Sequence, residues 1–432
     1  MAFTVTADSG PPPPSRSAAG RRPGPRVGEP GGGLPCRVPS TPTARRALVA
    51  VAFTAVAALG LAGGTVLAGR NADAPAAARP PGPPSAASQT PPAAQTPPAA
   101  QTPPAPTPEQ PPAAGVRIRL AFAGDVHFAG TSATALTSGL GPGAQPLRAA
   151  DLAVVNLETA VTDGGDPAPG KEFVFRAPPS ALTVLRDAGV DAVSLANNHG
   201  MDHGVSGLRD SLAASTAARL PVLGAGTDVT AAWAPLRRTV RGVRVSVIAA
   251  TDVLDDDLRG LWTAGPGKPG LASAKDGTAL ADALRAERPR TDVLVAFLHW
   301  GVEKESCPSM RQRTLARALV DAGADVVVGS HAHVLQPLTS LTAPGPGGAD
   351  DVGRSAVVAY GLGNFVFYGT TEPATRTGVL TVTATAVPGG GPDAPRTLTP
   401  TWTGARIVSG RPRPVPPARQ AAVQPPPIET CG

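Results

Sequence analysis

The histidines of this chain are concentrated where they could bind a metal ion. All six lie in short polar motifs, and each motif directly follows an apolar run that is typical of a β-strand. His331 and His333 are two residues apart, so on an extended segment both imidazoles would point to the same side and could face one ion. The motifs that contain the histidines are 124–127, 197–199, 202–203, 299–301 and 329–333.

Carboxylate and amide oxygens accompany these imidazoles. Asp125 lies two residues before His127, and Glu158 follows another apolar run. A mixed set of nitrogen and oxygen donors without a thiolate suits Mn, Fe or Zn, and seven ligands are too many for one tetrahedral ion. They suffice for two divalent ions that share a bridging carboxylate. The candidate metal ligands are Asp125, His127, Glu158, Asn198, His299, His331 and His333.

Each motif has a simpler explanation when it is taken alone. The Asp-x-His at 125–127 could cap the end of a strand, and Asn198 could serve a turn. His299, next to Trp300, could be a hydrogen-bonded core histidine. Random placement would put some histidines on helix faces or surface loops, and none falls there. The joint pattern therefore favours a metal-binding site.

A second group of residues could act next to such a site. Arg176 could clamp an anionic substrate, although a surface arginine is the simpler explanation. Glu303 could be a substrate-binding group, a ligand or a base, or an ordinary loop carboxylate. The acidic run 255–257 is typical of a solvated loop, and no role follows for His203.

Strands alternate with helices along the part of the chain that carries these motifs. Such alternation is typical of an α/β layered fold, in which the loops after the carboxyl ends of strands meet at one crevice. The last two strands, 377–386 and 399–408, have no helix between them, so we expect a second, more antiparallel sheet packed on the first. Apolar runs predict earlier strands at 116–122, 152–155, 192–195, 243–250, 293–298, 326–328 and 357–360, and three- and four-residue spacing predicts helices at 180–188, 207–217, 278–286 and 311–322.

The ordered motifs resemble those of one protein family. The chain is similar to the CapA family of poly-γ-glutamate capsule proteins in the series GDVH, NLE, LANNHGMDHG, HWGVE, GSHAHVLQP and GLGNFVF. That family belongs to the calcineurin-like metallophosphoesterase superfamily, and the resemblance covers residues 116–386. It implies a four-layer α/β/β/α sandwich of the metallophosphoesterase type with a dinuclear metal centre.

The resemblance also implies a role for each matching residue. Glu158 would replace the bridging aspartate that is usual in the superfamily. His199 would be the catalytic, non-ligand histidine beside the scissile group, oriented by Asp202. The residues assigned to one ion are Asp125, His127 and His333, and those assigned to the other are Asn198, His299 and His331.

The N-terminal part of the chain predicts membrane anchoring or export. Seven arginines and two acidic residues precede residue 47, and together they account for five of the six net positive charges of the chain. The folded part is therefore close to neutral, and its charge does not indicate nucleic-acid binding. The uncharged run 47–69 could form a transmembrane helix of about 35 Å. The arginine excess predicts a single-pass membrane protein with its C-terminal domain outside, and secretion after cleavage is the alternative.

Composition divides the chain into five parts. Residues 89–106 repeat QTPPAA, and proline at this density favours an extended, disordered linker. Cys307 and Cys431 would both lie outside the membrane, where thiols oxidise, but the sequence alone leaves their pairing open. The parts are a basic disordered tail (1–46), a transmembrane or signal segment (47–69), a linker (70–115), a CapA-like domain (116–410) and a Pro-rich C-terminal tail (411–432).

Two functions of different classes fit these features. One is a metal-dependent hydrolase in cell-envelope polymer metabolism, acting on a phosphoester or on an anionic envelope polymer. The other is a non-catalytic component of a capsule or exopolymer assembly complex, which would work with capsule-synthesis membrane proteins. An intact His199 favours catalysis, since a purely structural site does not need it.

Overall fold

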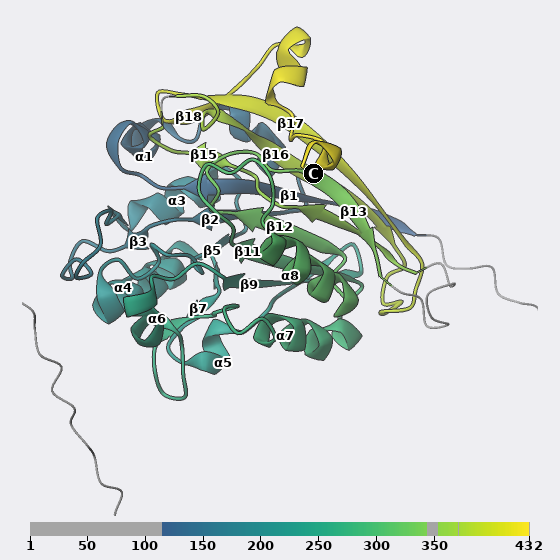
Figure 1. Cartoon of the computed structure of the whole chain (residues 1–432), viewed down its shortest axis with the longest axis horizontal. Helices are drawn as coiled ribbons and strands as arrows, with labels where there is room; N and C mark the ends of the chain where they lie inside the picture. The colour runs from purple at the N-terminus through teal and green to yellow at the C-terminus, as the bar shows by residue number, and fades with distance from the viewer. Residues whose placement is uncertain (1–114, 344–352, 370, 432) are drawn as a thin grey trace, which may run out of the picture. The chain divides into compact units, whose positions relative to one another are not determined.

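Two β-sheets form the framework of the folded unit (Figure 1). The computed structural model describes residues 115–343, 353–369 and 371–431. The predicted basic tail, membrane segment and linker before residue 115 lie outside these ranges. None of the helices within the described ranges has the length and apolar character needed to cross a bilayer.

The first sheet combines parallel and antiparallel strands. In spatial order its strands are β18 (Arg411–Pro414), β17 (Arg396–Val408), β16 (Arg376–Ala386), β1 (Val116–Val126), β2 (Leu152–Leu157), β5 (Ala192–Ser194) and β6 (Val222–Leu223), and β15 (Asn364–Val366) pairs with the end of β1. The strands β1, β2, β5 and β6 run parallel. β16 pairs antiparallel with β1 from Val116 to Phe122.

The second sheet has a parallel centre and antiparallel edges. In spatial order its strands are β13 (Leu338–Thr342), β14 (Ser355–Ala359), β12 (Val326–Ser330), β11 (Val293–His299), β9 (Val243–Thr251) and β8 (Leu236–Val240). The central strands β14, β12, β11 and β9 run parallel. Every residue of β11 is buried, as expected for a parallel strand that is covered on both faces.

The two sheets pack face to face, and helices cover their outer faces. Phe122 of β1 and Phe297 of β11 lie in the core between the sheets, with ring centroids 6.4 Å apart. The covering helices are α3 (Ser180–Asp187) and α4 (Gly204–Ala218) on the first sheet, and α7 (Ala279–Glu287) and α8 (Met310–Asp321) on the second. The layers therefore follow the order helix, sheet, sheet, helix.

Short elements connect these layers. The short elements are β3 (Ala160–Val161), β4 (Arg176–Ala177), β7 (Ala225–Gly226), β10 (Gly270–Leu271), α1 (Ala135–Ser138), α2 (Gln145–Arg148), α5 (Val229–Ala232) and α6 (Asp256–Trp262).

The expectation that 377–386 and 399–408 form a second sheet is wrong. These segments are β16 and β17, and because β16 pairs with β1 they extend the first sheet. The second sheet instead takes the parallel strands β9, β11, β12 and β14. The lack of an intervening helix correctly indicated antiparallel pairing, but it could not reveal which earlier strand β16 would join.

The segment after residue 410 belongs to the folded unit and is not a free tail. β18 pairs with β17, and short 3₁₀ helices follow at Pro417–Val423 and Ile428–Thr430. Val423 is fully buried, and its carbonyl oxygen accepts a hydrogen bond of 2.7 Å from the indole of Trp402. The many prolines do not oppose this packing, because edge strands and the first turns of helices tolerate proline.

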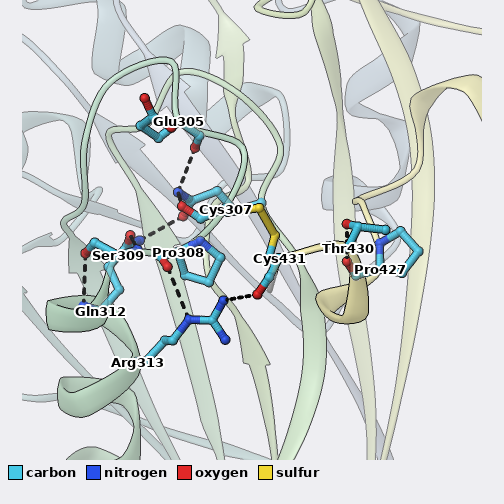
Figure 2. Close-up of a disulfide and its surroundings, with 10 residues drawn as sticks. Glu305, Cys307, Pro308, Ser309, Gln312, Arg313, Pro427, Thr430 and Cys431 are labelled. Atoms are coloured by element: carbon cyan, nitrogen blue, oxygen red, sulfur yellow. Dashed lines mark hydrogen bonds between the residues drawn. A yellow bond between two sulfur atoms is a disulfide. The ribbon is translucent and has the colours of Figure 1, made fainter.

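A disulfide joins the end of the chain to the loop that precedes α8 (Figure 2). Cys307 and Cys431 have Cα atoms 5.3 Å apart and close a loop with a sequence separation of 124 residues. Arg313 of α8 reinforces the link, since its guanidinium donates a hydrogen bond of 2.6 Å to the carbonyl oxygen of Cys431. The pairing that the sequence left open is therefore present.

Candidate metal centre

The carboxyl ends of strands from both sheets meet at one buried polar cluster. β11 ends at His299, and Glu158 directly follows β2. The candidate ligand atoms form three groups, within each of which all atoms lie within 4.8 Å of one another. The groups are Asp125, Glu158 and His333; Glu158, His299 and His331; and Glu303, His331 and His333.

Glu158 belongs to two of these groups. Its side chain is fully buried, and neither carboxylate oxygen has a hydrogen-bond partner among the described residues. Its Oε1 lies 3.4 Å from Nε2 of His299 and 3.9 Å from Nε2 of His333. Burial alone would raise the pKa of the Glu158 carboxyl, but the imidazoles of His333 and His299 more than offset burial and lower it. A buried, ionised carboxylate without donors is an environment that a cation would stabilise.

Asp125 is held by donors from two other segments of the chain. Nδ2 of Asn156 donates to Oδ1 at 2.8 Å, and the backbone N–H of His331 donates to Oδ2 at 3.2 Å. Nδ1 of His333 lies 3.2 Å from the same Oδ2. Asn156 also reaches the second sheet, because its Nδ2 lies 3.2 Å from Nδ1 of His299. One network therefore fixes ligand candidates from both sheets.

The backbone at His331 and His333 is turned, not extended as the sequence had suggested. The φ angles are 92° at His331 and 56° at His333, in the left-handed region that residues with a Cβ rarely adopt. This turn, rather than strand alternation, places the two ring centroids 5.8 Å apart. The N–H of Lys304 donates a hydrogen bond of 2.8 Å to the carbonyl oxygen of Ala332 and fixes the turn. Strained backbone that is held by its surroundings is typical of functional sites.

The pKa values of the two imidazoles of this turn are shifted in opposite directions. Burial would lower the pKa of His333, but the carboxylates of Glu158 and Asp125 raise it to about 10. Burial and the neighbouring imidazoles of His299 and His333 lower the pKa of His331 well below its usual value. Nδ1 of His331 has no hydrogen-bond partner among the described residues. His331 therefore offers a neutral ring, as metal coordination requires.

The segment after β5 presents two adjacent polar residues. Oδ1 of Asn198 lies 2.8 Å from Nε2 of His299, and Nδ1 of His199 lies 2.6 Å from Oδ2 of Asp202. Asn197 fixes this segment, because its Oδ1 accepts a hydrogen bond of 3.0 Å from the N–H of His199. A candidate ligand and an oriented imidazole thus follow one another in the chain.

Lys171 joins this network from the segment between β3 and β4. Its Nζ lies 2.7 Å from Oδ1 of Asp202 and also donates to the carbonyl oxygen of Asn198. The side chain of Lys171 is only 7% exposed. The N–H of Phe175 donates to Oδ2 of Asp202 at 2.6 Å. The Asp202 carboxylate therefore holds the His199 ring and the Lys171 segment together.

A cleft of about 310 Å³ opens beside these residues. Asn198 and His199 form part of its wall, so the cleft reaches the candidate centre. This volume lies at the small end of the range for ligand pockets and suits a small substrate group. The other lining residues are Pro169, Gly170, Lys171, Glu172, Phe173, Asp255, Asp257, Leu258 and Glu303.

His127 lies close to the centre but belongs to none of the three groups. The N–H of Ala129 donates to its Nδ1 at 3.0 Å, so the neutral ring carries its proton on Nε2. Burial lowers the pKa of His127 to about 3. The rings of Phe175 and Phe367 lie 4.9 Å and 4.0 Å from it, measured between centroids. Ligation by Nε2 would require its proton to move to Nδ1, and the hydrogen bond from Ala129 would then be lost.

The unpaired atoms of the cluster fit a divalent cation. Both carboxylate oxygens of Glu158 and Nδ1 of His331 are buried without hydrogen-bond partners among the described residues. Such atoms are costly in a folded protein, and here they lie in neighbouring residues of one cluster. Nitrogen and oxygen donors in this mixture suit Mn, Fe or Zn.

The sequence matches one known family over more than half of its length. Residues 119–369 match the family described as bacterial capsule synthesis protein PGA_cap. The chain belongs to this family. The PGA_cap match includes every candidate metal ligand as well as His199 and Asp202, and it confirms the capsule-protein resemblance of the motifs.

Two curated relatives of this PGA_cap protein carry the name CapA. The PGA biosynthesis protein CapA of Bacillus subtilis is 33% identical over 222 residues, which are 51% of this chain and 54% of the relative. The capsule biosynthesis protein CapA of Bacillus anthracis is 34% identical over 200 residues, which are 46% and 45% of the two chains. The chain therefore spans about half the length of these relatives. A solved structure of a novel phosphatase from Mycoplasma pneumoniae aligns with a TM-score of 0.38 and 15% identity, over 67% of this chain and 94% of that chain.

The two predicted substrate-binding residues of this PGA_cap protein have different surroundings. Arg176 is exposed on β4, and it does not line the cleft. Glu303 is also exposed, but it lines the cleft and forms a ligand group with His331 and His333. Of these two residues, Glu303 therefore has a contact with the candidate ligands.

Several contributors to the PGA_cap site were not predicted. Asn156 is part of the quoted NLE motif, but its contact with Asp125 exists only once β1 and β2 pair. Lys171 lies in a loop rich in glycine and proline, where no periodicity marks it. The acidic run 255–257 is not a simple loop, because it forms the cap and first turn of α6. His203 holds the same loop as Lys171, since its Nδ1 lies 3.0 Å from the carbonyl oxygen of Gly165.

Proposed function

We propose that this protein is a metal-dependent hydrolase of the phosphoesterase type. The bond that it cleaves would be a phosphoester, or an amide or ester bond of a cell-envelope polymer. The proposal depends on His199, which lines the cleft next to the candidate ligand Asn198 and is hydrogen-bonded to Asp202. A site that only stabilised the fold would not need an oriented, non-ligating imidazole at a cleft wall.

Two divalent ions, Mn, Fe or Zn, are the proposed cofactors. Glu158 would bridge them, and its membership of two separate ligand groups supports that role. Bound ions of this kind lower the pKa of a water towards about 7 and withdraw charge from the scissile group. One ion would be held by Asp125, His333 and, in its other tautomer, His127, and the other by Asn198, His299 and His331.

Side chains of the protein would transfer a proton to the leaving atom. With Nδ1–H directed at Asp202, His199 keeps Nε2 for proton exchange with the substrate. Lys171 restrains this arrangement, because it contacts the other oxygen of Asp202 and the backbone of Asn198. Together these contacts give the imidazole one orientation before the substrate binds, which lowers the cost of reaching the reactive geometry.

The hydrolase would act outside the membrane in capsule or poly-γ-glutamate metabolism. The names of the two Bacillus relatives support this setting. A disulfide at Cys307 and Cys431 supports an oxidising compartment. Residues 47–69 would anchor or export the protein, with the linker 70–115 as a spacer. Capsule-synthesis membrane proteins would be its partners.

Hydrolysis of an aryl phosphodiester by the purified full-length protein with Mn²⁺ tests the proposal. We expect His199→Ala to lower kcat/KM by about 10²–10³-fold, because an oriented donor at the reacting group is lost. Metal analysis of the variant should match that of the wild type, since His199 is not a proposed ligand. Circular dichroism provides the folding control.

The opposite results would favour the non-catalytic alternative. A wild-type protein that binds metal but is inert on phosphodiesters and on poly-γ-glutamate with Mn²⁺, Fe²⁺ and Zn²⁺ would point to a role in polymer assembly. A wild-type protein that binds no metal would contradict the centre itself.

A further inference from the structure

Carboxylates dominate the rim of the cleft. Of the eleven residues that line it, four are acidic and one is a lysine. All four acidic residues are exposed. They come from three separate segments of the chain, and they are Glu172, Asp255, Asp257 and Glu303.

The charge of the one lysine is already neutralised inside the protein. Lys171 is 7% exposed, and its Nζ lies 2.7 Å from Oδ1 of Asp202 and 3.7 Å from Oδ2 of Asp255. In contrast, Glu172, Asp257 and Glu303 form no ion pair with any residue of the described ranges. The rim therefore presents net negative charge to an entering molecule.

Helix capping explains only part of this cluster. Asp255 is the N-cap residue of α6 and Asp257 lies in its first turn, where acidic side chains stabilise a helix. Glu172 and Glu303 belong to other loops and have no such role. The cleft is the feature that all four residues share.

The rim also borders the candidate metal centre directly. The Glu303 carboxylate lies within 4.8 Å of the ligand atoms of His331 and His333. His331 is 6% exposed, and its Nδ1 has no partner among the described residues. A bound molecule would therefore place its reacting group at the centre and its adjoining group among the rim carboxylates.

An aromatic side chain completes the rim. Phe173 also lines the cleft and is 54% exposed, although large apolar side chains are usually buried. An aromatic face next to carboxylates is a surface that attracts ammonium groups. It gives an anionic group no favourable partner.

We infer that the cleft selects substrates that carry a cationic, ammonium-type group next to the scissile bond. This inference rests on the proposed hydrolase function and names its substrate class. The scissile group binds at the metal centre, while Glu172, Asp257 and Phe173 contact the cation. A polymer with a free carboxylate on every residue would be repelled at this rim, so poly-γ-glutamate itself is disfavoured as the molecule that is cleaved.

Three matched phosphodiesters test the inference on the full-length protein with Mn²⁺. They are 4-nitrophenyl phosphocholine, the ester in which a tert-butyl group replaces the trimethylammonium group, and the ester in which a carboxylate replaces it. We expect kcat/KM for the cationic ester to exceed that for the neutral ester by about tenfold or more, since a cleft lined by one charge sign concentrates the opposite charge. The anionic ester should be the poorest, and added salt should reduce both differences.

A double variant locates the origin of the preference. Glu172→Gln with Asp257→Asn should bring the ratio of the cationic to the neutral ester close to one. Asp282→Asn is the matched control, because Asp282 is an exposed acidic residue of α7 outside the cleft, and the ratio should stay as in the wild type.

Each other outcome is decisive. Hydrolysis of all three esters at equal kcat/KM overturns the inference and leaves the hydrolase proposal intact. A preference that survives in the double variant overturns the assignment to the rim. No hydrolysis of any ester overturns the inference, and if poly-γ-glutamate also stays intact with Mn²⁺, Fe²⁺ and Zn²⁺, the hydrolase proposal is overturned as well.

Discussion

Oδ2 of Asp202 lies 2.6 Å from Nδ1 of His199, and Oδ1 of the same carboxylate lies 2.7 Å from Nζ of Lys171. One buried carboxylate thus orients an imidazole and neutralises an ammonium group. The arrangement fixes the tautomer of His199, because a carboxylate can only accept a hydrogen bond from Nδ1–H.

Replacing Asp202 should therefore impair catalysis without removing the metal. In Asp202→Asn the amide can present an N–H to His199 and favour the wrong tautomer, so we expect kcat/KM to fall by about 10–100-fold. Steady-state hydrolysis of an aryl phosphodiester measures this effect. Unchanged activity at unchanged metal content would show that Asp202 has only a structural role.

Glu158→Gln should abolish the stabilisation that metal gives. The wild-type carboxylate is fully buried without donors, and a neutral amide removes the negative charge that a shared cation requires. Saturation at about 100 times Kd stabilises a protein by about 2.7 kcal/mol. We expect Mn²⁺ to raise the wild-type Tm and to leave that of Glu158→Gln unchanged, as measured by differential scanning calorimetry.

The metal-free forms provide the control for Glu158→Gln. Without metal the variant should be less stable than the wild type, since it loses the carboxylate whose pKa His333 and His299 lower and which raises the pKa of His333. A variant whose Tm still rises with Mn²⁺ as in the wild type would exclude Glu158 as a ligand.

The carboxylate of Asp292 should make the free energy of unfolding depend on pH in acid. It is 2% exposed and accepts hydrogen bonds from Arg244, Gly389 and Gly391, and despite its burial these partners lower its pKa from 3.8 to about 2. A folded-state pKa below the unfolded one stabilises the protein above pH 3.8, and this contribution is lost as the pH falls through about 2.

Asp292→Asn should accordingly lower the free energy of unfolding by about 2 kcal/mol at pH 7. The difference from the wild type should shrink as the pH falls below 4 towards 2. Urea unfolding at several pH values measures it, and Asp282→Asn, in an exposed pair with Arg285, should show almost no difference. A constant difference at all pH values would contradict the assignment to ionised Asp292.

Removal of the Cys307–Cys431 disulfide should destabilise both the fold and the centre. Cross-links of this kind typically contribute about 2–4 kcal/mol, so Cys307→Ser should lower the unfolding free energy by that amount. The same loop reaches the centre, since Glu303 precedes Cys307 and Lys304 donates to Ala332. Weaker Mn²⁺ binding by titration calorimetry should therefore accompany the loss of stability.

Controls separate the disulfide from the thiols. Cys431→Ser should reproduce both effects, and dithiothreitol should produce them in the wild type, whereas Cys36→Ser should produce neither. Retained Mn²⁺ affinity in Cys307→Ser would show that the loop does not support the centre.

The periodicity of the sequence located most regular elements but not their partners. The predicted helices at 180–188 and 311–322 correspond to α3 and α8. β8 was not predicted, because three of its five residues are exposed and its stability comes from pairing with β9. Sheet membership depends on contacts between distant segments, which explains why β16 was assigned to the wrong sheet.

The site was predictable where residues of a metal-binding type lie at the ends of predicted strands. Five of the seven predicted ligands fall in the three groups, because parallel strands bring their carboxyl ends together. The ligand assignment itself stays a prediction. Lys171 could not be found from the sequence, since its contact with Asp202 depends on how a glycine- and proline-rich loop folds. The left-handed backbone at His331 was equally hidden.

The family similarity ends at residue 369, whereas the first sheet continues for three more strands. β16 contributes Leu380 and Val382 to the core between the sheets and covers the edge of β1, the strand that carries Asp125. A chain shortened to residues 119–369 would expose that hydrogen-bonding edge and part of an apolar interior, which favours aggregation. The independently folding unit of this protein therefore extends beyond the segment that matches the family and includes β16, β17 and β18.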